Sequence, residues 1–468
     1  MEEQKKKGLN ISAKSFITAI VVIFCLMVAA YILALVVPGG QYQRVEDASG
    51  NMLIDTEAGF AYVEGGIPFW KWVLSPFLVL GASGSGSLIA VIAFLIVIGG
   101  IFNALNACGL IEYMLGRLTQ KFADKRYLLM ALVILFFMAL GSLVGSFEEC
   151  VPLVPIVVAL AINLGWDVLT GVGMSLLAVG CGFAAGVYNP FTVGVAQQLA
   201  GLPMFSGVWL RLISFVVIYG VLFGFIYLHA KRVEKPIDLE NGVKKLESDP
   251  KMNRASICFI SILGAGILTI FCSGFIPALQ DFTMIIVAVM FLVAGIVSTK
   301  VAGMSWKELG KKAWEGIVGI IPAVAMILMA SSIKYTLEEA NILDTILHSA
   351  VGVAEKLPTW TVILFIYLIV LFMNFFIPSG SAKAVMLIPL IVPMAQIFGI
   401  STQLCIVAFA FGDGFSNVLY PTNPVLLISL GLADVNYGKW FKWTWKFQLL
   451  NLVITSGILL FGFAVGYC

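Results

Sequence analysis

The sequence predicts an all-α, polytopic membrane protein with two inverted repeats, each containing a re-entrant helix hairpin and a proline-broken helix. Hydrophobic residues make up 60% of the 468 residues, charged residues only 12%, and the mean hydropathy is +1.01. A soluble domain carries about 25% charged residues. Apolar runs long enough to span a bilayer, about 18 residues or more, recur along the chain. Two of these runs are interrupted at corresponding places in the two halves.

Nine full membrane spans are expected along the chain. They lie near 15–37, 86–107, 168–188, 206–229, 255–274, 281–299, 317–335, 403–420 and 446–467. Short cytoplasmic loops are rich in Lys and Arg, and the basic loops share one side only if the two interrupted runs turn back without crossing. We therefore expect a cytoplasmic N-terminus and an external C-terminus.

The two interrupted runs are related by a constant offset. Small and charged residues break an apolar run at 145–149 and again at 378–383. Adding 234 to the residue number carries Glu149 onto Lys383. The same offset carries Pro155 onto Pro389, Gly165 onto Gly399, Gly180 onto Gly414, and Asn189-Pro190 onto Asn423-Pro424. We expect hairpins at about 127–164 and 360–398, opening to opposite sides, as at the substrate site of a secondary transporter.

The expected division is a first repeat at 1–232, a cytoplasmic linker at 233–254 and a second repeat at 255–468. In each repeat, the helix after the hairpin should break at a proline, within about 168–200 and 403–433. Proline lacks a backbone donor and disfavours helix in the residue before it. Such breaks would offer helix N-termini to an anion and bare carbonyls to a cation. The alternative is that the prolines only kink the helices.

Three expectations concern segments outside the hairpins. Trp70–Trp72 and Trp306–Glu308 each indicate a short interfacial helix ahead of a span. Arg211, at the start of a span, is expected to lie at the membrane interface. The polar, Gly-rich stretch 41–67 is expected to be an ordinary connection.

Ionisable residues within the apolar runs are the candidate site. Glu148, Glu149, Lys383 and Asp413 would each cost several kcal/mol if left unpaired in lipid. Because Glu149 and Lys383 occupy matched positions, we expect the tips to bring these opposite charges together. The pair would either pin the tips as a structural salt bridge or line a substrate cavity. The predicted substrate-binding residues are Ser146, Glu148, Glu149, Asn189, Pro190, Thr192, Ser379, Gly380, Ser381, Lys383, Asp413, Thr422 and Asn423, with a sodium or proton site at Glu148, Glu149 and Asp413.

Several longer motifs resemble one group of carriers. The string from Asn189 to Pro203, Pro378–Lys383, Phe411–Ser416 and Tyr420–Thr422 resemble the YfcC family of bacterial inner-membrane carriers. That family is similar to the anaerobic C4-dicarboxylate carriers of the ion transporter superfamily. The resemblance implies a scaffold domain, a transport domain that holds both hairpins, an elevator-like motion and a homodimer.

The resemblance leaves the substrate open. The Ser-Asn-Thr tips of related sodium-dicarboxylate carriers are replaced here by Ser146-Phe-Glu148 and Ser379-Gly-Ser381. This replacement argues against carrying over sodium coupling or dicarboxylate specificity.

We therefore expect a secondary active transporter or exchanger of a small carboxylate-bearing metabolite. Three acidic groups against one lysine favour an amino acid, with a basic one ahead of a C4-dicarboxylate coupled to sodium or protons. An intramembrane hydrolase using Ser379 or Ser381 with Lys383 is disfavoured, because the spacing is neither SxxK nor GxSxG. The expected partners are the substrate, the lipid bilayer and a second copy of the chain; no nucleic acid and no cofactor beyond a coupling ion are indicated.

Overall fold

The protein is described by a computed structural model that covers residues 13–46, 52–54, 59–82, 85–145, 147–203, 205–235, 249–273, 283–354 and 357–468. Each of the nine predicted spans coincides with a helical segment. These segments are α1 (Ala13–Val36), α3 (Ser85–Ala107), α7 to α8 (Val168–Ala185), α10 (Val208–Val233), α11 (Pro250–Ser273), α13 (Thr283–Val301), α14 (Trp306–Glu339), α18 (Thr402–Asn417) and α20 (Tyr437–Ala464).

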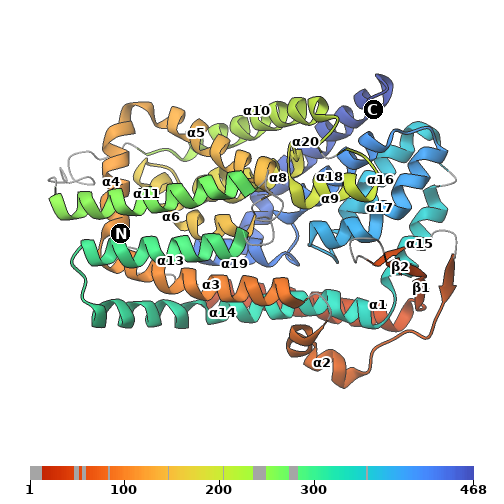
Figure 1. Ribbon diagram of the computed structural model, residues 1–468, viewed down its shortest axis with the longest axis horizontal. Helices are drawn as coiled ribbons and strands as arrows, with labels where there is room; N and C mark the ends of the chain where they lie inside the picture. Colours follow the sequence, from red (N-terminus) through yellow and green to blue (C-terminus); the bar gives the residue numbers. More distant parts are fainter. Residues whose placement is uncertain are drawn as a thin grey trace.

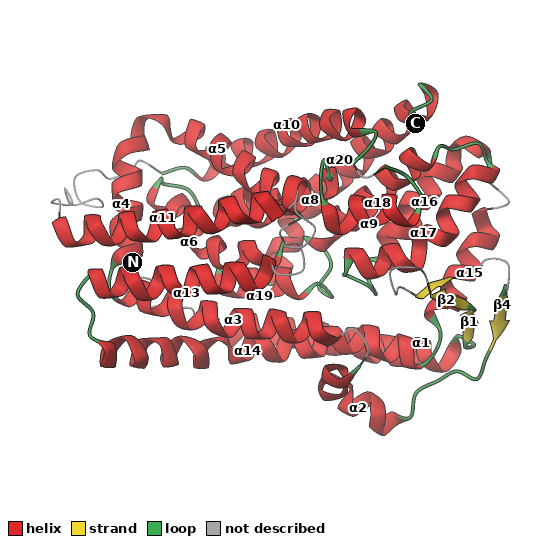
Figure 2. Ribbon diagram, in the orientation of Figure 1, coloured by secondary structure: helices red, strands yellow, loops and turns green. Residues whose placement is uncertain are grey.

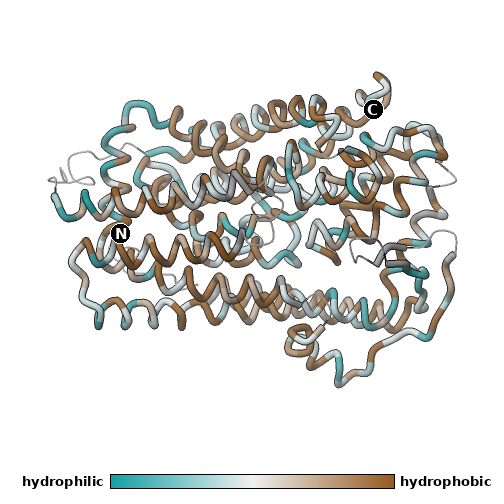
Figure 3. The backbone as a smooth tube through the Cα atoms, in the orientation of Figure 1, coloured by the Kyte–Doolittle hydropathy of each residue, from teal (hydrophilic) through white to brown (hydrophobic). Residues whose placement is uncertain are grey.

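The helices form two groups. In one group, α14 packs on α1 and α3, while α13 packs on α3 and α11. In the other, the hairpins and broken helices pack together with α10 and α20. Figure 1 shows α1, α3, α13 and α14 along one edge of the molecule and α10 along the opposite edge. Hydrophobic residues cover the long helices of both groups (Figure 3), as expected for elements that face lipid on one side and protein on the other.

The first hairpin returns to the face from which it enters. It comprises α5 (Arg126–Ala139), a π-helical turn η3 (Leu140–Val144), a 3₁₀ segment η4 (Glu148–Leu153) and α6 (Val154–Asn163). Its two ends meet, because Arg126 Nη1 donates to the carbonyl oxygen of Leu164 at 3.3 Å. The helix ends at Gly145, whose φ of 75° is a left-handed conformation that favours glycine.

The second hairpin comprises α16 (Thr359–Met373) and α17 (Gly380–Ile397), joined by the turn 374–379. Both arms contact α15 (Leu343–Ala354), which lies at the opposite end of the molecule from α4 (Leu110–Phe122). Among the described residues, seven segments are long and apolar enough to cross a membrane, and the hairpin arms Arg126–Val144 and Gly380–Ile397 are two of them. Length and composition therefore do not distinguish a hairpin arm from a span.

The expectations for the stretch 41–67 and for Trp306–Glu308 were wrong. The stretch 41–67 is not a plain connection, since β1 (Gly40–Tyr42) pairs with β4 (Phe60–Tyr62) and β2 (Arg44–Glu46) pairs with β3 (Met52–Ile54), as Figure 2 shows in yellow. Arg44 of this region forms an ion pair with Asp344 at 2.9 Å, which joins the strands to α15. The separate helix expected at Trp306–Glu308 is the first turn of the continuous α14, whereas α2 (Phe69–Leu78) is a helix of its own.

The broken helices cross each other at two glycines. A Cβ atom on Gly180 would overlap the side chain of Val418, and one on Gly414 would overlap Ala184. The two contact pairs correspond under the offset of 234, which carries Gly180 onto Gly414 and Ala184 onto Val418. Small residues at these positions let α8 (Ala178–Ala185) and α18 approach closely, and this crossing sets the spacing of both breaks.

Candidate functional site

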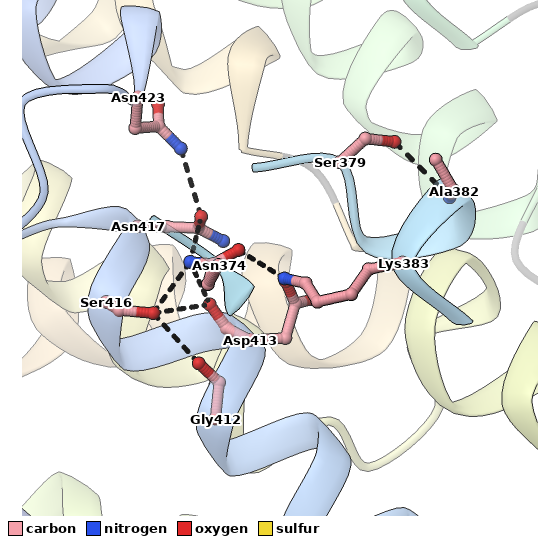
Figure 4. A network of polar contacts seen from close by, with 9 residues as sticks. All are labelled: Asn374, Ser379, Ala382, Lys383, Gly412, Asp413, Ser416, Asn417 and Asn423. Carbon is pink, nitrogen blue, oxygen red and sulfur yellow. Dashed lines mark hydrogen bonds and ion pairs between the residues drawn. The ribbon is translucent and has the colours of Figure 1, made fainter. Parts of the chain in front are cut away.

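A buried ion pair lies where the second hairpin meets α18. Lys383 on α17 bonds to Asp413 Oδ1 and Asn374 Oδ1, and all three side chains are buried (Figure 4). The predicted pairing of Lys383 with Glu149 was therefore wrong. The reason is geometric. Because α18 packs against both arms of the second hairpin, α16 and α17, Asp413 on α18 lies next to the ammonium of Lys383.

Asn374 organises the rest of this network. Its Nδ2 atom lies 3.0 Å from the backbone oxygen of Asp413, 2.6 Å from Ser416 Oγ and 2.9 Å from Asn417 Oδ1. Asn423 Nδ2 donates to the same Asn417 oxygen at 3.0 Å. Sequence reasoning missed Asn374, although a lone amide next to an apolar run in a hairpin was the available signal.

Each broken helix restarts with the same asparagine cap. Asn189 Oδ1 accepts the backbone N–H groups of Phe191 and Thr192 at 3.0 and 3.3 Å. Asn423 Oδ1 accepts those of Val425 and Leu426 at 2.9 and 3.4 Å. Pro190 and Pro424 fill the first helical position, where the missing N–H costs nothing. Two N–H groups at each restart are therefore already paired within the protein, and the meeting of these helix N-termini with an anion stays a prediction.

Three carbonyls at the breaks have side-chain donors. Arg211 Nε donates to the oxygen of Val187 at 3.3 Å, and Trp440 Nε1 donates to the oxygen of Val418 at 2.8 Å. Tyr437 donates to the oxygen of Leu419 at 2.9 Å. These three oxygens are not bare, and a cation at the other carbonyls of the breaks stays a prediction.

Arg211 is a functional candidate that the sequence misplaced. Its side chain is fully buried rather than interfacial, because the end of α8 offers a backbone oxygen to its guanidinium. Nη2 donates to the oxygen of Phe205 at 3.2 Å, while Nη1 is buried without a partner. A cation at the C-terminal end of a helix is stabilised by the helix dipole.

Five predicted site residues carry a buried polar atom without a hydrogen-bond partner. They are Glu149 Oε2, Asn189 Nδ2, Thr192 Oγ1, Asp413 Oδ2 and Thr422 Oγ1. Buried polar groups in folded proteins are almost always paired. These five atoms are candidate ligand contacts; seven further unpaired atoms lie on other described residues.

Several of these residues are neighbours. A Cβ atom on Gly380 would lie 2.7 Å from Asp413 Oδ2 and 2.7 Å from Thr192 Cγ2. Hence α17, α18 and the π-helical turn η6 (Pro190–Gly194) meet over this glycine. The first tip adjoins the same elements, because a Cβ atom on Gly145 would overlap Asn189 Oδ1 and would lie 2.8 Å from the ring of Phe191.

Other predicted residues lie at the margin. Ser379 is exposed, and its hydroxyl caps the backbone N–H of Ala382 at 3.5 Å rather than pointing to the cluster. Ser381 is half-buried on the following turn. Ser146 lies outside the described residues. No group of three or more His, Cys, Asp or Glu side chains suited to a metal ion occurs in the part of the chain that the structure describes.

Comparison with known proteins places the chain in a family. Residues 16–464 match the family DcuC, described as the C4-dicarboxylate anaerobic carrier. The chain belongs to this family. It is accordingly a multi-pass membrane transporter and not an enzyme, which confirms the expectations drawn from the YfcC-like motifs.

Individual relatives agree with this assignment. The chain is 30% identical over 412 residues to YfcC of Escherichia coli K12, provisionally named a basic amino acid antiporter; the match covers 82% of this chain and 80% of that protein. It is 26% identical to an uncharacterised Haemophilus influenzae protein over 80% of this chain and 76% of that one.

Two solved transporter structures match along most of the chain at low similarity. YdaH of Alcanivorax borkumensis is 16% identical, with a TM-score of 0.46 over 97% of this chain and 99% of that one. Neisseria gonorrhoeae MtrF, described in a study of antimetabolite efflux pumps, is 16% identical, with a TM-score of 0.45 over 95% of this chain and 94% of that one.

Proposed function

We propose that this transporter is a secondary active carrier or exchanger for an amino acid, with a basic amino acid favoured. The proposal rests on the balance of positive and negative side chains in the cluster. Lys383 is already paired with Asp413, which leaves Glu148 and Glu149 without a cation among the described residues. An ammonium or guanidinium group of a substrate would supply it.

A C4-dicarboxylate is the second candidate. The family description names this substrate class, and Arg211 holds one buried N–H without a partner. A carboxylate of the substrate would pair with that guanidinium. The acidic residues of the first tip would then have to be neutralised by sodium or protons, which is the coupling expected for this alternative.

The two helix groups support an elevator-like mechanism of alternating access. One group contains both hairpins and both broken helices, and it would move as a unit against the group formed by α1, α3, α11, α13 and α14. The 234-residue correspondence of the asparagine caps and of the glycine crossing supports two inverted repeats at 1–232 and 255–468. By the resemblance, the carrier is a homodimer in a bacterial cytoplasmic membrane, with its N-terminus inside and its C-terminus outside.

Transport by purified protein in liposomes tests the proposal. Vesicles loaded with unlabelled arginine should take up labelled arginine or lysine faster than labelled succinate or malate, and each measurement is repeated with sodium and with pH gradients. Glu149→Gln should abolish uptake, whereas Glu315→Gln, which removes an exposed carboxylate paired with Lys312, should leave it unchanged. Uptake of succinate that neither arginine nor lysine competes with would support the dicarboxylate alternative instead.

A further inference from the structure

We propose that the unpaired atoms of the site form a binding set for the zwitterionic head group of an α-amino acid. This inference rests on the proposed function and deepens it, because it assigns the two charges of the head group to different elements. The acceptors lie on the first hairpin tip and on α18, while the donors lie on the asparagine cap and on η6.

The donor side is fixed by the cap. Asn189 Oδ1 accepts two backbone N–H groups, so the amide can only be oriented with Nδ2 as the unpaired atom. That Nδ2 atom is an obligatory donor. Thr192, whose backbone N–H is one of the two that Asn189 caps, contributes its hydroxyl. The side chains of Asn189 and Thr192 are fully buried. Two adjacent donors on one turn suit a carboxylate.

The acceptor side is fixed by the ion pair. Asp413 Oδ1 is held by Lys383, so Oδ2 is the free oxygen, and it lies on the side of Gly380 and Thr192. Glu149 Oε2 is the second free acceptor. The first tip lies against the asparagine cap, because a Cβ atom on Gly145 would overlap Asn189 Oδ1. Two carboxylate oxygens on the elements that meet there suit an ammonium.

Gly380 brings the two sides close together. A single added carbon atom there would overlap both Asp413 Oδ2 and the methyl carbon Cγ2 of Thr192, at 2.7 Å from each. Asp413 of the acceptor side and Thr192 of the donor side are thus immediate neighbours across this glycine.

Other ligand classes leave part of the set unmatched. A dicarboxylate would place its oxygens against Glu149 Oε2 and Asp413 Oδ2, which only accept when they are ionised. A simple amine would satisfy these carboxylates but leave Asn189 Nδ2 and the hydroxyl of Thr192 buried and unpaired. An α-amino acid matches both sides at once.

Binding of three related probes tests the inference. Lysine, 1,5-diaminopentane, which lacks the carboxylate, and 6-aminohexanoate, which lacks the α-amino group, compete for labelled lysine uptake in liposomes. Each truncated probe should compete about 10- to 100-fold more weakly than lysine, the range for loss of one charge-assisted hydrogen-bonded group.

Two variants should separate the two sides. Thr192→Val should weaken lysine about tenfold and leave 1,5-diaminopentane unchanged, because only the carboxylate loses a partner. Glu149→Gln should weaken lysine and 1,5-diaminopentane and leave 6-aminohexanoate unchanged. Probe binding to Glu149→Gln is measured by thermal stabilisation in detergent, which needs no transport.

A matched control and a rescue variant keep the test decisive. Thr444→Val removes an equally buried hydroxyl that bonds only to its own helix, through the oxygen of Trp440 at 2.9 Å, and should change no probe. Thr192→Ser keeps the hydroxyl and should bind like the parent protein even if Thr192→Val does not fold.

The outcomes distinguish the two proposals. The head-group assignment is overturned, while amino acid transport stands, in either of two cases. In the first, 1,5-diaminopentane competes as well as lysine. In the second, Thr192→Ser no longer discriminates between lysine and 1,5-diaminopentane as the parent protein does. If no amino acid competes and succinate does, the proposed function fails, and the inference fails with it.

Discussion

The two hairpin tips are held by different physical means. The second tip is fixed by charge and amides, through Lys383, Asp413 and Asn374. The first tip is fixed by close packing: a Cβ on Gly141 would overlap the backbone of Val179, and one on Gly182 would overlap the backbone of Met138. Two places that correspond under the 234-residue offset can therefore be fixed by unrelated chemistry.

This contrast has a functional consequence. The ion pair at the second tip is complete, so its charges are already balanced. At the first tip, Glu149 keeps a free oxygen. Under the proposed function, a ligand cation would pair with this free carboxylate oxygen and with the free Oδ2 of Asp413, while the bond from Lys383 to Asp413 Oδ1 holds the second tip.

The largest expected effect follows from removal of the lysine. Lys383→Met leaves Asp413 charged and unpaired in a buried site, which should lower the free energy of unfolding by about 3–5 kcal/mol. Thermal unfolding in detergent measures this loss. The double variant Lys383→Met/Asp413→Asn should recover most of the stability but no transport.

A surface lysine gives the matched control. Lys334→Met removes a partly exposed pair with Glu338 and should cost less than about 1 kcal/mol. A fully stable Lys383→Met single variant would contradict the view that the second tip depends on charge pairing.

The next effect concerns the close contact at Gly380. Gly380→Ala adds one methyl group that overlaps Asp413 Oδ2 and Thr192, both of which are fully buried. We expect amino acid uptake in liposomes to fall at least about tenfold, and we expect the overlap to lower the free energy of unfolding by about 1–3 kcal/mol. Normal uptake by this variant would place the substrate elsewhere.

The packing of the first tip gives a smaller effect. Gly182→Ala forces a methyl group into the backbone of Met138, and overpacking of this kind costs about 1–3 kcal/mol. Gly220→Ala, on α10 with no atom within 4 Å of the added carbon, is the matched control and should be neutral or slightly stabilising. The two unfolding temperatures should move in different directions; equal shifts would argue against close packing as the support of this tip.

The smallest effect is a pH dependence of stability that comes from Asp167, just after the first hairpin. Burial raises the pKa of Asp167, but hydrogen bonds from His229 and Thr170 outweigh it and hold the pKa at about 2. A depressed carboxyl pKa stabilises the fold above the ordinary value near 3.8, and this contribution is lost as the pH falls towards 2.

Asp167→Asn tests this contribution. The stability difference between the parent protein and the variant should stay constant above pH 5 and shrink between pH 4 and pH 2. Unfolding midpoints measured across that range provide the check. A difference that persists unchanged to pH 2 would exclude the carboxylate as its source.

Much of the fold was predictable because it depends on local rules. Asn189-Pro190 and Asn423-Pro424 predicted helix breaks, and both pairs restart a helix in the same way. Glu148, Asp413 and Lys383 were expected to meet other polar groups because isolated charges are too costly in lipid, and this was confirmed for the lysine and Asp413.

The partners of these groups were not predictable. Lys383 meets Asp413 rather than Glu149, Arg211 is buried against Val187, and Asn374 joins hairpin to helix. Each of these contacts depends on the position of one helix along another, and hydropathy carries no information on that position.

The sequence by itself determined which segments enter the membrane, where they break and which residues are too polar to face lipid. These features follow from composition and backbone chemistry within a few residues. Only the tertiary structure decided which charges neutralise each other and which atoms remain free. The crossing of α8 and α18 at Gly180 and Gly414 sets those distances, because close packing at small residues fixes the position of every side chain on both helices.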